Sequence, residues 1–282
     1  MKRVARASRR KRKRALPAVA AGLGAAPHLE EVKMYTKQDL MANLSAIGID
    51  PKGTLKIHIS CKAVGEVDGR GDTILDALME YMSQGLLVLP AHTWGNVKQP
   101  VNPIMDVLYT PTCVGVLTEM FRKREGVIRS LHPTHSVAAY GKDAETFVVG
   151  EEKLQTPCGK GGAYHKLWER NAQILLIGIS FANNTFMHGI EEWDKAEGSI
   201  SKEVSNLYVI NHQGQRLHTL QYRHCATLGS SPFIKVEPQA IQEGILTLGC
   251  FGDATTRLMS AKPLREMVAK LLKDDPKYLG RY

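Results

Sequence analysis

Cysteine is scarce in this sequence and follows no paired spacing. The 282 residues contain five cysteines and no Cys-x-x-Cys pair. A disulfide framework and a zinc ribbon both need closely spaced sets of cysteines, so neither is expected. Unpaired thiols are typical of a reducing compartment, and the expected location is therefore the cytoplasm.

Long hydrophobic runs are also missing. The apolar stretch that follows the N-terminus, residues 15–26, is too short to cross a bilayer and is interrupted by Pro17, Gly22 and Gly24. No signal peptide is recognisable, although the arginine-rich start without acidic residues leaves a targeting segment open. Binding to a membrane is not expected.

Three motifs that would define other enzyme classes are absent. The chain has no Gly-x-Gly-x-x-Gly, no Walker lysine and no Gly-x-Ser-x-Gly. A dinucleotide fingerprint, a P-loop and the nucleophile elbow of a Ser-His-acid hydrolase are therefore not indicated.

The net charge of +9 is confined to one end of the chain. Nine of the 37 Lys and Arg residues lie within residues 2–14, which contain no acid, so 28 basic residues remain to balance 28 acidic ones. This tail, followed by Ala, Gly and Pro, is predicted to be disordered over residues 1–30. The neutral body gives no reason to expect specific nucleic-acid binding, and a non-specific polyanion-binding arm is the alternative.

Residues 31–282 are expected to form a single domain in which strands alternate with helices. The predicted strands are 54–59, 86–90, 137–140, 174–179 and 245–248, and the predicted helices are 36–48, 73–84, 111–124, 143–149, one after Asn183 and Asn184, and 253–272, interrupted at Pro263. Residues 200–223 alternate like two strands joined at Gln213 and Gly214. This order predicts an α/β/α layered sandwich with a mostly parallel mixed sheet and an antiparallel hairpin annex.

Polar residues gather near the ends of several predicted strands. His92 follows strand 86–90, while Arg129, Ser130 and His135 precede strand 137–140. Ligands of open α/β sheets bind at such edges. Gly-rich loops at 68–72 and 158–162 lie before helices, where anions are held, although plain turn chemistry also explains them. The sequence therefore predicts a polar cleft that contains histidines.

Residues 183–193 carry the main candidate for acid–base chemistry. His188 and Glu191 are three residues apart, so both side chains lie on one face of the helix that Asn183 and Asn184 are expected to cap. Such a pair suits general acid–base catalysis, and a surface ion pair is the plainer alternative.

Two other kinds of chemistry are suggested by single residues. Cys158 precedes a helix, where a lowered thiol pKa would make it a nucleophile, although a lone loop cysteine is usually inert. His132 and His135 are three residues apart, but no third ligand has the spacing of a metal site. No metal is expected.

Four segments match, in order along residues 36–272, the motifs of one enzyme family. Residues 58–65 read HISCKAVG, residues 89–93 LPAHT, residues 129–141 RSLHPTHSVAAYG and residues 184–191 NTFMHGIE. They resemble the His-Ser-Ser-type loop, the Pro-Thr-His-Thr strand end, Arg-Ser-x-His-Pro-x-x-Ser-x-Ala-Ala-x-Gly and Asn-Thr-x-x-His-x-x-Glu of the aminoglycoside 3-N-acetyltransferase family. This family differs in fold from the GNAT acetyltransferases.

The resemblance implies an acyltransferase that moves an acetyl group from acetyl-coenzyme A to a small-molecule amine. In that case His188 would accept a proton from the acceptor ammonium, and Glu191 would orient its imidazole. The implied cofactor contacts are Ser60, Lys62, Ala63, Val64, Gly65, Thr73, Arg129, Ser130 and His135, and the implied substrate contacts are His92, Cys158 and Glu192.

The resemblance defines the acceptor less closely. Residues 186–190 differ from the Ser-Leu-His-Leu-Ala of many antibiotic-modifying members, and Gly189 is expected to weaken the helix by about 1 kcal/mol relative to Ala. An acidic rim formed by Glu191, Glu192 and Asp194 is expected to attract an aminoglycoside-like or other amino-sugar acceptor. Acyl transfer through Cys158 and a non-catalytic binding protein are the alternatives, and a homodimer is an expected assembly.

Overall fold

The computed structural model describes residues 33–225 and 231–279. Residues from Lys33 onward form one compact unit. The predictions for the basic tail over residues 1–30 lie outside the described residues. No helix in the described ranges is long and apolar enough to cross a membrane.

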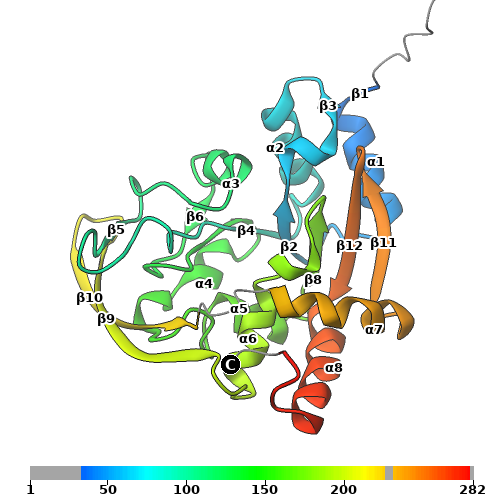
Figure 1. The fold of residues 1–282 in the computed structure, drawn as a ribbon. Coiled ribbons are helices and arrows are strands. Elements are labelled where there is room, and N and C mark those ends of the chain that lie inside the picture. Colours follow the sequence, from blue (N-terminus) through cyan, green and yellow to red (C-terminus); the bar gives the residue numbers. More distant parts are fainter. Residues whose placement is uncertain (1–32, 226–230, 280–282) are drawn as a thin grey trace, which may run out of the picture. The chain divides into compact units, whose positions relative to one another are not determined.

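A mixed sheet of seven strands forms the centre of the described fold (Figure 1). The strands, in spatial order, are β11 (Leu246–Phe251), β12 (Ala254–Ser260), β8 (Gln173–Ile177), β2 (Thr54–Ile59), β4 (Leu86–Pro90), β7 (Val137–Gly141) and β6 (Ile128–Arg129). Only β8, β2 and β4 pair in parallel, and the other four pairings are antiparallel. The sheet is mixed as predicted, but its parallel part is limited to the three central strands.

Helices cover both faces of this sheet, as the predicted α/β/α sandwich requires. Successive residues of β4 point to opposite faces, so Leu86 and Val88 join one apolar core while Leu87 and Leu89 join the other. One face carries α1 (Lys37–Ile47), α2 (Arg70–Tyr81) and α3 (Val116–Phe121), and the other carries α4 (Ala144–Val148), α5 (Ala163–Glu169), α6 (Phe186–Trp193), α7 (Glu237–Gln242) and α8 (Ala261–Asp274).

The predicted hairpin annex is confirmed. Strands β9 (Ile200–Ile210) and β10 (Arg216–His224) pair antiparallel, with a turn that uses Gly214 at φ 75°. β9 also pairs with β5 (Ile104–Asp106), so the annex is a separate sheet beside the main one (Figure 1). The remaining elements are β1 (Met34–Tyr35), β3 (Glu66–Val67) and the 3-10 turns η1 (Cys61–Val64), η2 (Glu151–Lys153), η3 (Phe181–Asn183) and η4 (Ser231–Val236).

The predicted closing helix over 253–272 is wrong in its first half. Residues 254–260 form β12 because they find strand partners on both sides, β11 and β8, and tertiary pairing overrides local preference. The helix begins only at Ala261, so Pro263 lies in its first turn, where its missing N–H costs nothing, and does not interrupt it.

Two other helix boundaries also differ from the prediction. α2 begins at Arg70 rather than at residue 73, and α3 covers only Val116–Phe121 of the predicted 111–124 because Gly115, at φ 126°, precedes it. The predicted start of α1 is confirmed, since Thr36 accepts from the backbone N–H of Asp39 in a capping box.

Candidate functional site

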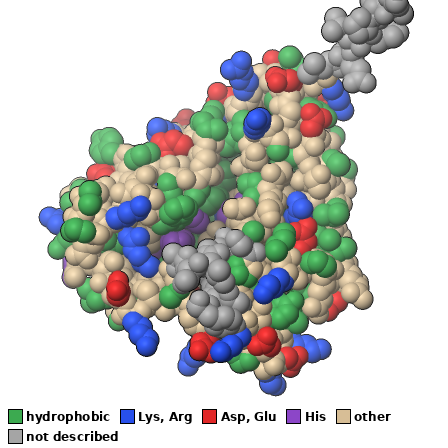
Figure 2. All heavy atoms as spheres, viewed as in Figure 1, with side chains coloured by type: hydrophobic (Ala, Val, Ile, Leu, Met, Phe, Trp, Pro, Cys, Tyr) green, Lys and Arg blue, Asp and Glu red, His purple; other side chains and the backbone are tan. Residues whose placement is uncertain are grey.

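A cavity of about 590 Å³ opens where the main sheet meets the annex. Figure 2 shows a hollow on this face with hydrophobic and histidine side chains inside it. The cavity is lined by His58, Pro90, His92, Trp94, Cys113, Val114, Thr134, His135, Ile179, Ala182, Asn183, Thr185, His188, Arg223, His224 and Cys225. The lining includes residues that follow β4 and β8, so the predicted histidine-containing cleft is present.

His188 and Glu191 are hydrogen bonded on the wall of this cavity. His188 Nδ1 lies 3.1 Å from Glu191 Oε2, and the side chain of Glu191 is only 1% exposed. A buried carboxylate holding an imidazole that lines a cavity is not a solvated surface pair. The prediction that Asn183 and Asn184 cap α6 is wrong, because Thr185 is the N-cap residue and makes no side-chain capping bond. Asn184, one residue earlier, accepts from the N–H of Phe186, and Asn183 lies in η3 and lines the cavity.

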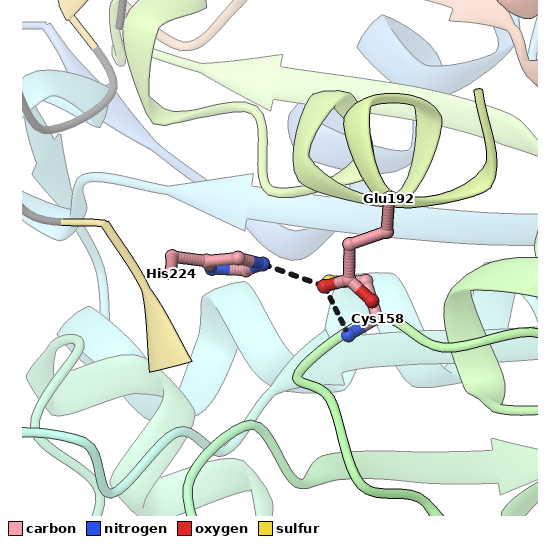
Figure 3. A group of neighbouring side chains, drawn as sticks. All are labelled: Cys158, Glu192 and His224. Atoms are coloured by element: carbon pink, nitrogen blue, oxygen red, sulfur yellow. Dashed lines mark hydrogen bonds and ion pairs between the residues drawn. The ribbon is translucent and has the colours of Figure 1, made fainter. Parts of the chain in front are cut away.

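A second histidine–glutamate pair lies directly against the first. His224 Nε2 is 2.6 Å from Glu192 Oε1, and the rings of His224 and His188 stack with centroids 4.1 Å apart and an interplanar angle of 18°. The same Glu192 oxygen also accepts from the backbone N–H of Cys158 at 2.8 Å. Figure 3 shows both contacts meeting at this oxygen. Burial raises the pKa of Glu192 to about 7.

His224 was not among the residues that the sequence identified. It is the last residue of β10, in the annex, and it lies 32 residues from Glu192 in sequence. No motif spacing links a strand end to a helix at that distance, so only the packing of the annex reveals this pair.

The predicted acidic rim is wrong. Glu191 and Glu192 are buried behind the two histidines, and Asp194 is bonded to Arg265 at 2.7 Å. These carboxylates orient imidazoles or pair with arginine inside the protein, so they present no acidic surface to a ligand.

The other cavity histidines are held neutral by burial. His92 Nε2 lies 2.7 Å from the hydroxyl of Tyr164, and the His92 ring is 4.8 Å from that of His135. Burial lowers the pKa of His58, His92 and His135 well below the ordinary 6.5. His92 and His135, predicted as substrate and cofactor contacts, therefore face the cavity as uncharged hydrogen-bonding groups.

Arg129 and Ser130 lie beneath the cavity rather than on its wall. The guanidinium of Arg129 donates to the carbonyls of Ala91 and Thr110, and the hydroxyl of Ser130 donates to the buried Glu151 at 2.9 Å. Their contacts brace the loops around His92 and His135. Direct contact with a cofactor stays a prediction.

The predicted donor loop forms the 3-10 turn η1 at the end of β2. Within it Lys62 is exposed and Val64 is buried, whereas Ser60, Ala63 and Gly65 are half-buried. A Cβ placed on Gly178 would lie 2.2 Å from Ala63 Cβ, so the turn packs against the end of β8, next to Ile179 on the cavity wall. Thr73 lies in the first turns of α2, close to Gly69. The loop adjoins the cavity, and its contact with a donor stays a prediction.

Cys158 is buried at 1% exposure and is not among the lining residues. Burial raises the pKa of its thiol well above the ordinary 9.0. The thiol is therefore protonated at neutral pH, which is the opposite of an activated nucleophile.

One group in the described residues has the donor types of a metal site. Ligand atoms of Cys158, Glu192 and His224 lie within 4.8 Å of one another (Figure 3). Glu192 Oε1 already accepts from two N–H groups there, so hydrogen bonding accounts for the arrangement. His132 and His135 do not share such a group, since Nδ1 of His132 accepts from the backbone N–H of His135. The expectation of no metal stays a prediction.

The fold and the cavity define a mixed α/β protein whose cleft carries a histidine–glutamate pair. A family model described as aminoglycoside 3-N-acetyltransferase matches residues 57–273. The chain therefore belongs to the aminoglycoside 3-N-acetyltransferase family, and the predicted family and acyltransferase class are confirmed.

Two curated relatives show how far the similarity extends. The SPbeta prophage-derived aminoglycoside N(3')-acetyltransferase-like protein YokD of Bacillus subtilis is 29% identical over 54% of this chain and 63% of its own length. Aminoglycoside N(3)-acetyltransferase VII of Streptomyces paromomycinus is 27% identical over 80% of this chain and 88% of its own length. The match thus spans less than two thirds of the Bacillus protein and most of the Streptomyces one.

Solved structures share the fold. Aminoglycoside acetyltransferase AAC(3)-Xa superposes with a TM-score of 0.76 at 23% identity, covering 88% of this chain and 95% of its own. AAC-IIIb, solved as a binary complex with CoASH, gives a TM-score of 0.75 at 22% identity, covering 86% of this chain and 97% of its own. The predicted fold class is confirmed.

Proposed function

We propose that the protein transfers an acetyl group from acetyl-coenzyme A to an amine of an aminoglycoside-like or other amino-sugar acceptor. In this proposal His188 is the general base and Glu191 orients it. The observation that carries the proposal is the 3.1 Å contact between His188 Nδ1 and the buried Glu191 Oε2 at the wall of the cavity.

The chemistry requires a base because the acceptor arrives protonated. An alkylammonium has a pKa of roughly 9 to 10, so it has no lone pair to attack with at neutral pH. Nε2 of His188 accepts the proton, since Nδ1 is the nitrogen bonded to Glu191. The freed amine attacks the thioester carbonyl, the N–C bond forms, the C–S bond breaks, and coenzyme A leaves as its thiolate. The second proton of the attacking nitrogen passes to this thiolate, and the His188 imidazolium returns its proton to solvent. A positioned base contributes about 10²- to 10⁴-fold.

Glu191 has two effects in this mechanism. Its carboxylate fixes the tautomer and orientation of His188, and it stabilises the imidazolium that forms when the proton is accepted. Because Glu191 is buried, solvent screens this interaction weakly.

The donor is proposed to lie along the turn that follows β2. This turn packs on the strand end that carries Ile179 into the cavity, and AAC-IIIb, which shares the fold, was solved with CoASH. On the acceptor side, AAC-VIa, with a TM-score of 0.72, was solved with sisomicin. A cytoplasmic location and a homodimer complete the proposal, and light scattering on the eluting peak of a sizing column tests the dimer.

Acyl transfer through Cys158 is disfavoured by its surroundings. An acyl-enzyme would need a thiolate at the cavity wall, whereas the thiol is buried, protonated and outside the lining. Direct transfer requires no such group.

Thiol release tests the proposal. Incubation of the full chain with acetyl-coenzyme A and a panel of amino sugars and aminoglycosides should release free thiol with at least one acceptor. Absence of release with every acceptor, together with no acetyl-coenzyme A binding by calorimetry, would reject it.

A further inference from the structure

The described wall of the cavity lacks the acidic side chains that an aminoglycoside acceptor would require. Among the described residues, its lining holds one arginine and five histidines but no Asp or Glu. The five residues 226–230, which follow Cys225, contain no acidic residue in the sequence. Aminoglycosides carry several ammonium groups, and a site built for a polycation needs carboxylates to offset them.

Three carboxylates that bond to lining residues, or to an arginine that does, are already held within the protein. Glu191 holds His188 and Glu192 holds His224. Glu237 is 2.6 Å from the Nε of Arg257, whose Nη1 donates to the carbonyl of the lining residue Ile179. Each of these carboxylates is held by an imidazole or a guanidinium, and none of them is a lining residue, so a polycationic ligand would meet no carboxylate on the described wall of the cavity.

Arg223 supplies the formal positive charge of the lining. It precedes His224 in β10, and its Nη2 donates to the carbonyl of Val97 at 2.8 Å. None of the ion pairs found among the described residues includes it, and desolvation alone lowers its pKa. A guanidinium carries five N–H donors in a fork that matches carboxylate and phosphate oxygens.

The position of Arg223 favours the acceptor over the donor as its anionic partner. Arg223 and the proposed base His188 line the same cavity, and His224, the residue after Arg223, stacks on His188. In acetyl-coenzyme A the phosphates are separated from the thioester by the whole pantetheine arm. An anion held at Arg223 while the acetyl group lies at His188 therefore belongs to the other substrate.

We propose that the acceptor is an amino sugar bearing an anionic group, phosphate or carboxylate, which Arg223 binds while the amine faces His188. The inference rests on the proposed function and narrows its acceptor class. It places polycationic aminoglycosides among the poor ligands of this protein.

Calorimetry on the full chain saturated with coenzyme A separates the acceptor site from the donor site. Glucosamine 6-phosphate and glucosaminuronic acid are titrated against glucosamine and sisomicin. The expected result is binding of at least one anionic sugar about tenfold or more tighter than glucosamine, because a charge-assisted contact is gained. Thiol release with acetyl-coenzyme A should follow the same order, and the two anionic probes distinguish phosphate from carboxylate recognition.

Variants at Arg223 link the preference to this side chain. Arg223→Gln should reduce the ratio of anionic to neutral affinity to near one, and Arg223→Lys should keep part of it because the charge remains without the fork. Arg216→Gln, an exposed arginine of the same strand, should keep the full preference. Tighter binding of sisomicin than of either anionic sugar, or an unchanged preference in a folded Arg223→Gln protein, would overturn the inference. Absence of thiol release with any amine would instead reject the proposed function, since the binding comparison does not depend on turnover.

Discussion

His188 and His224 stack face to face at 4.1 Å, and each is held by its own carboxylate from consecutive positions of α6. Two positive charges at this separation repel by about 4 kcal/mol at an effective dielectric of about 20. The stack therefore resists holding two protons at once.

Replacement of His224 should destabilise the protein, because the buried carboxylate of Glu192 would lose its hydrogen-bond partner. In His224→Phe the ring stack is retained, but Glu192 loses a 2.6 Å hydrogen-bond partner while remaining buried. We expect the free energy of unfolding to fall by about 1–3 kcal/mol. Urea unfolding measures this, and His218→Phe, at an exposed position of the same strand, should change it by less than about 0.5 kcal/mol. Equal losses in both variants would contradict the role given to Glu192.

For Gly189→Ala, helix propensity and side-chain packing predict opposite changes in stability. From helix propensity alone, Gly189→Ala should stabilise α6 by about 1 kcal/mol. An added Cβ would however lie 2.7 Å from the ring of Trp193, which is fixed by the hydrogen bond from its Nε1 to the carbonyl of Cys158. We expect a net loss of about 1–3 kcal/mol, measured by urea unfolding. A more stable variant would show that the ring gives way easily.

Cys158 should prove dispensable for turnover. Its protonated, buried thiol predicts that Cys158→Ala keeps kcat within about twofold and loses about 1 kcal/mol of stability through the small cavity left behind. Iodoacetamide on the native protein should label the exposed Cys250 and spare Cys158, as read by peptide mass spectrometry. Loss of turnover with intact folding, or an acetylated Cys158, would restore the alternative mechanism.

Glu151 should make stability depend on pH. Burial raises the pKa of Glu151 from 4.5 to about 7, so the folded protein retains a proton there that the unfolded chain has already released. Its contribution to stability is then present below pH 4.5 and is lost as the pH rises toward about 7, on the order of 3 kcal/mol in total. The buried histidines act in the opposite direction, so wild type must be compared with Glu151→Gln. The stability of the wild type relative to the variant should decline over this interval, and a constant difference would contradict the buried-acid account.

Local pattern predicted the elements that bury apolar side chains, and it failed where long-range pairing decides. β4 and β8 are recognisable because continuous apolar runs suit strands covered on both faces, and β2 because Thr54–Ile59 alternates in the manner of a strand. The sequence of residues 254–260 predicts a helix rather than β12, because no local pattern indicates that β11 and β8 will pair with it on either side.

In the site, too, local spacing predicts some contacts, whereas contacts between distant segments are not predicted. His188 and Glu191 share a helix face, so their contact follows from spacing. His224 reaches α6 from the annex, and Glu191 and Glu192 are buried behind the two histidines. These contacts join segments that are distant in sequence, so the sequence predicts an acidic rim where the structure has a stack of two imidazoles.

Turnover of His188→Ala tests the central claim most directly. With acetyl-coenzyme A and the best acceptor of the thiol-release panel, kcat should fall by at least about 10²-fold while the affinity for acetyl-coenzyme A, measured by calorimetry, stays nearly unchanged. His218→Ala, at an exposed histidine, serves as the matched control and should retain full activity. A folded His188→Ala protein that turns over at the wild-type rate would contradict general-base catalysis by this residue.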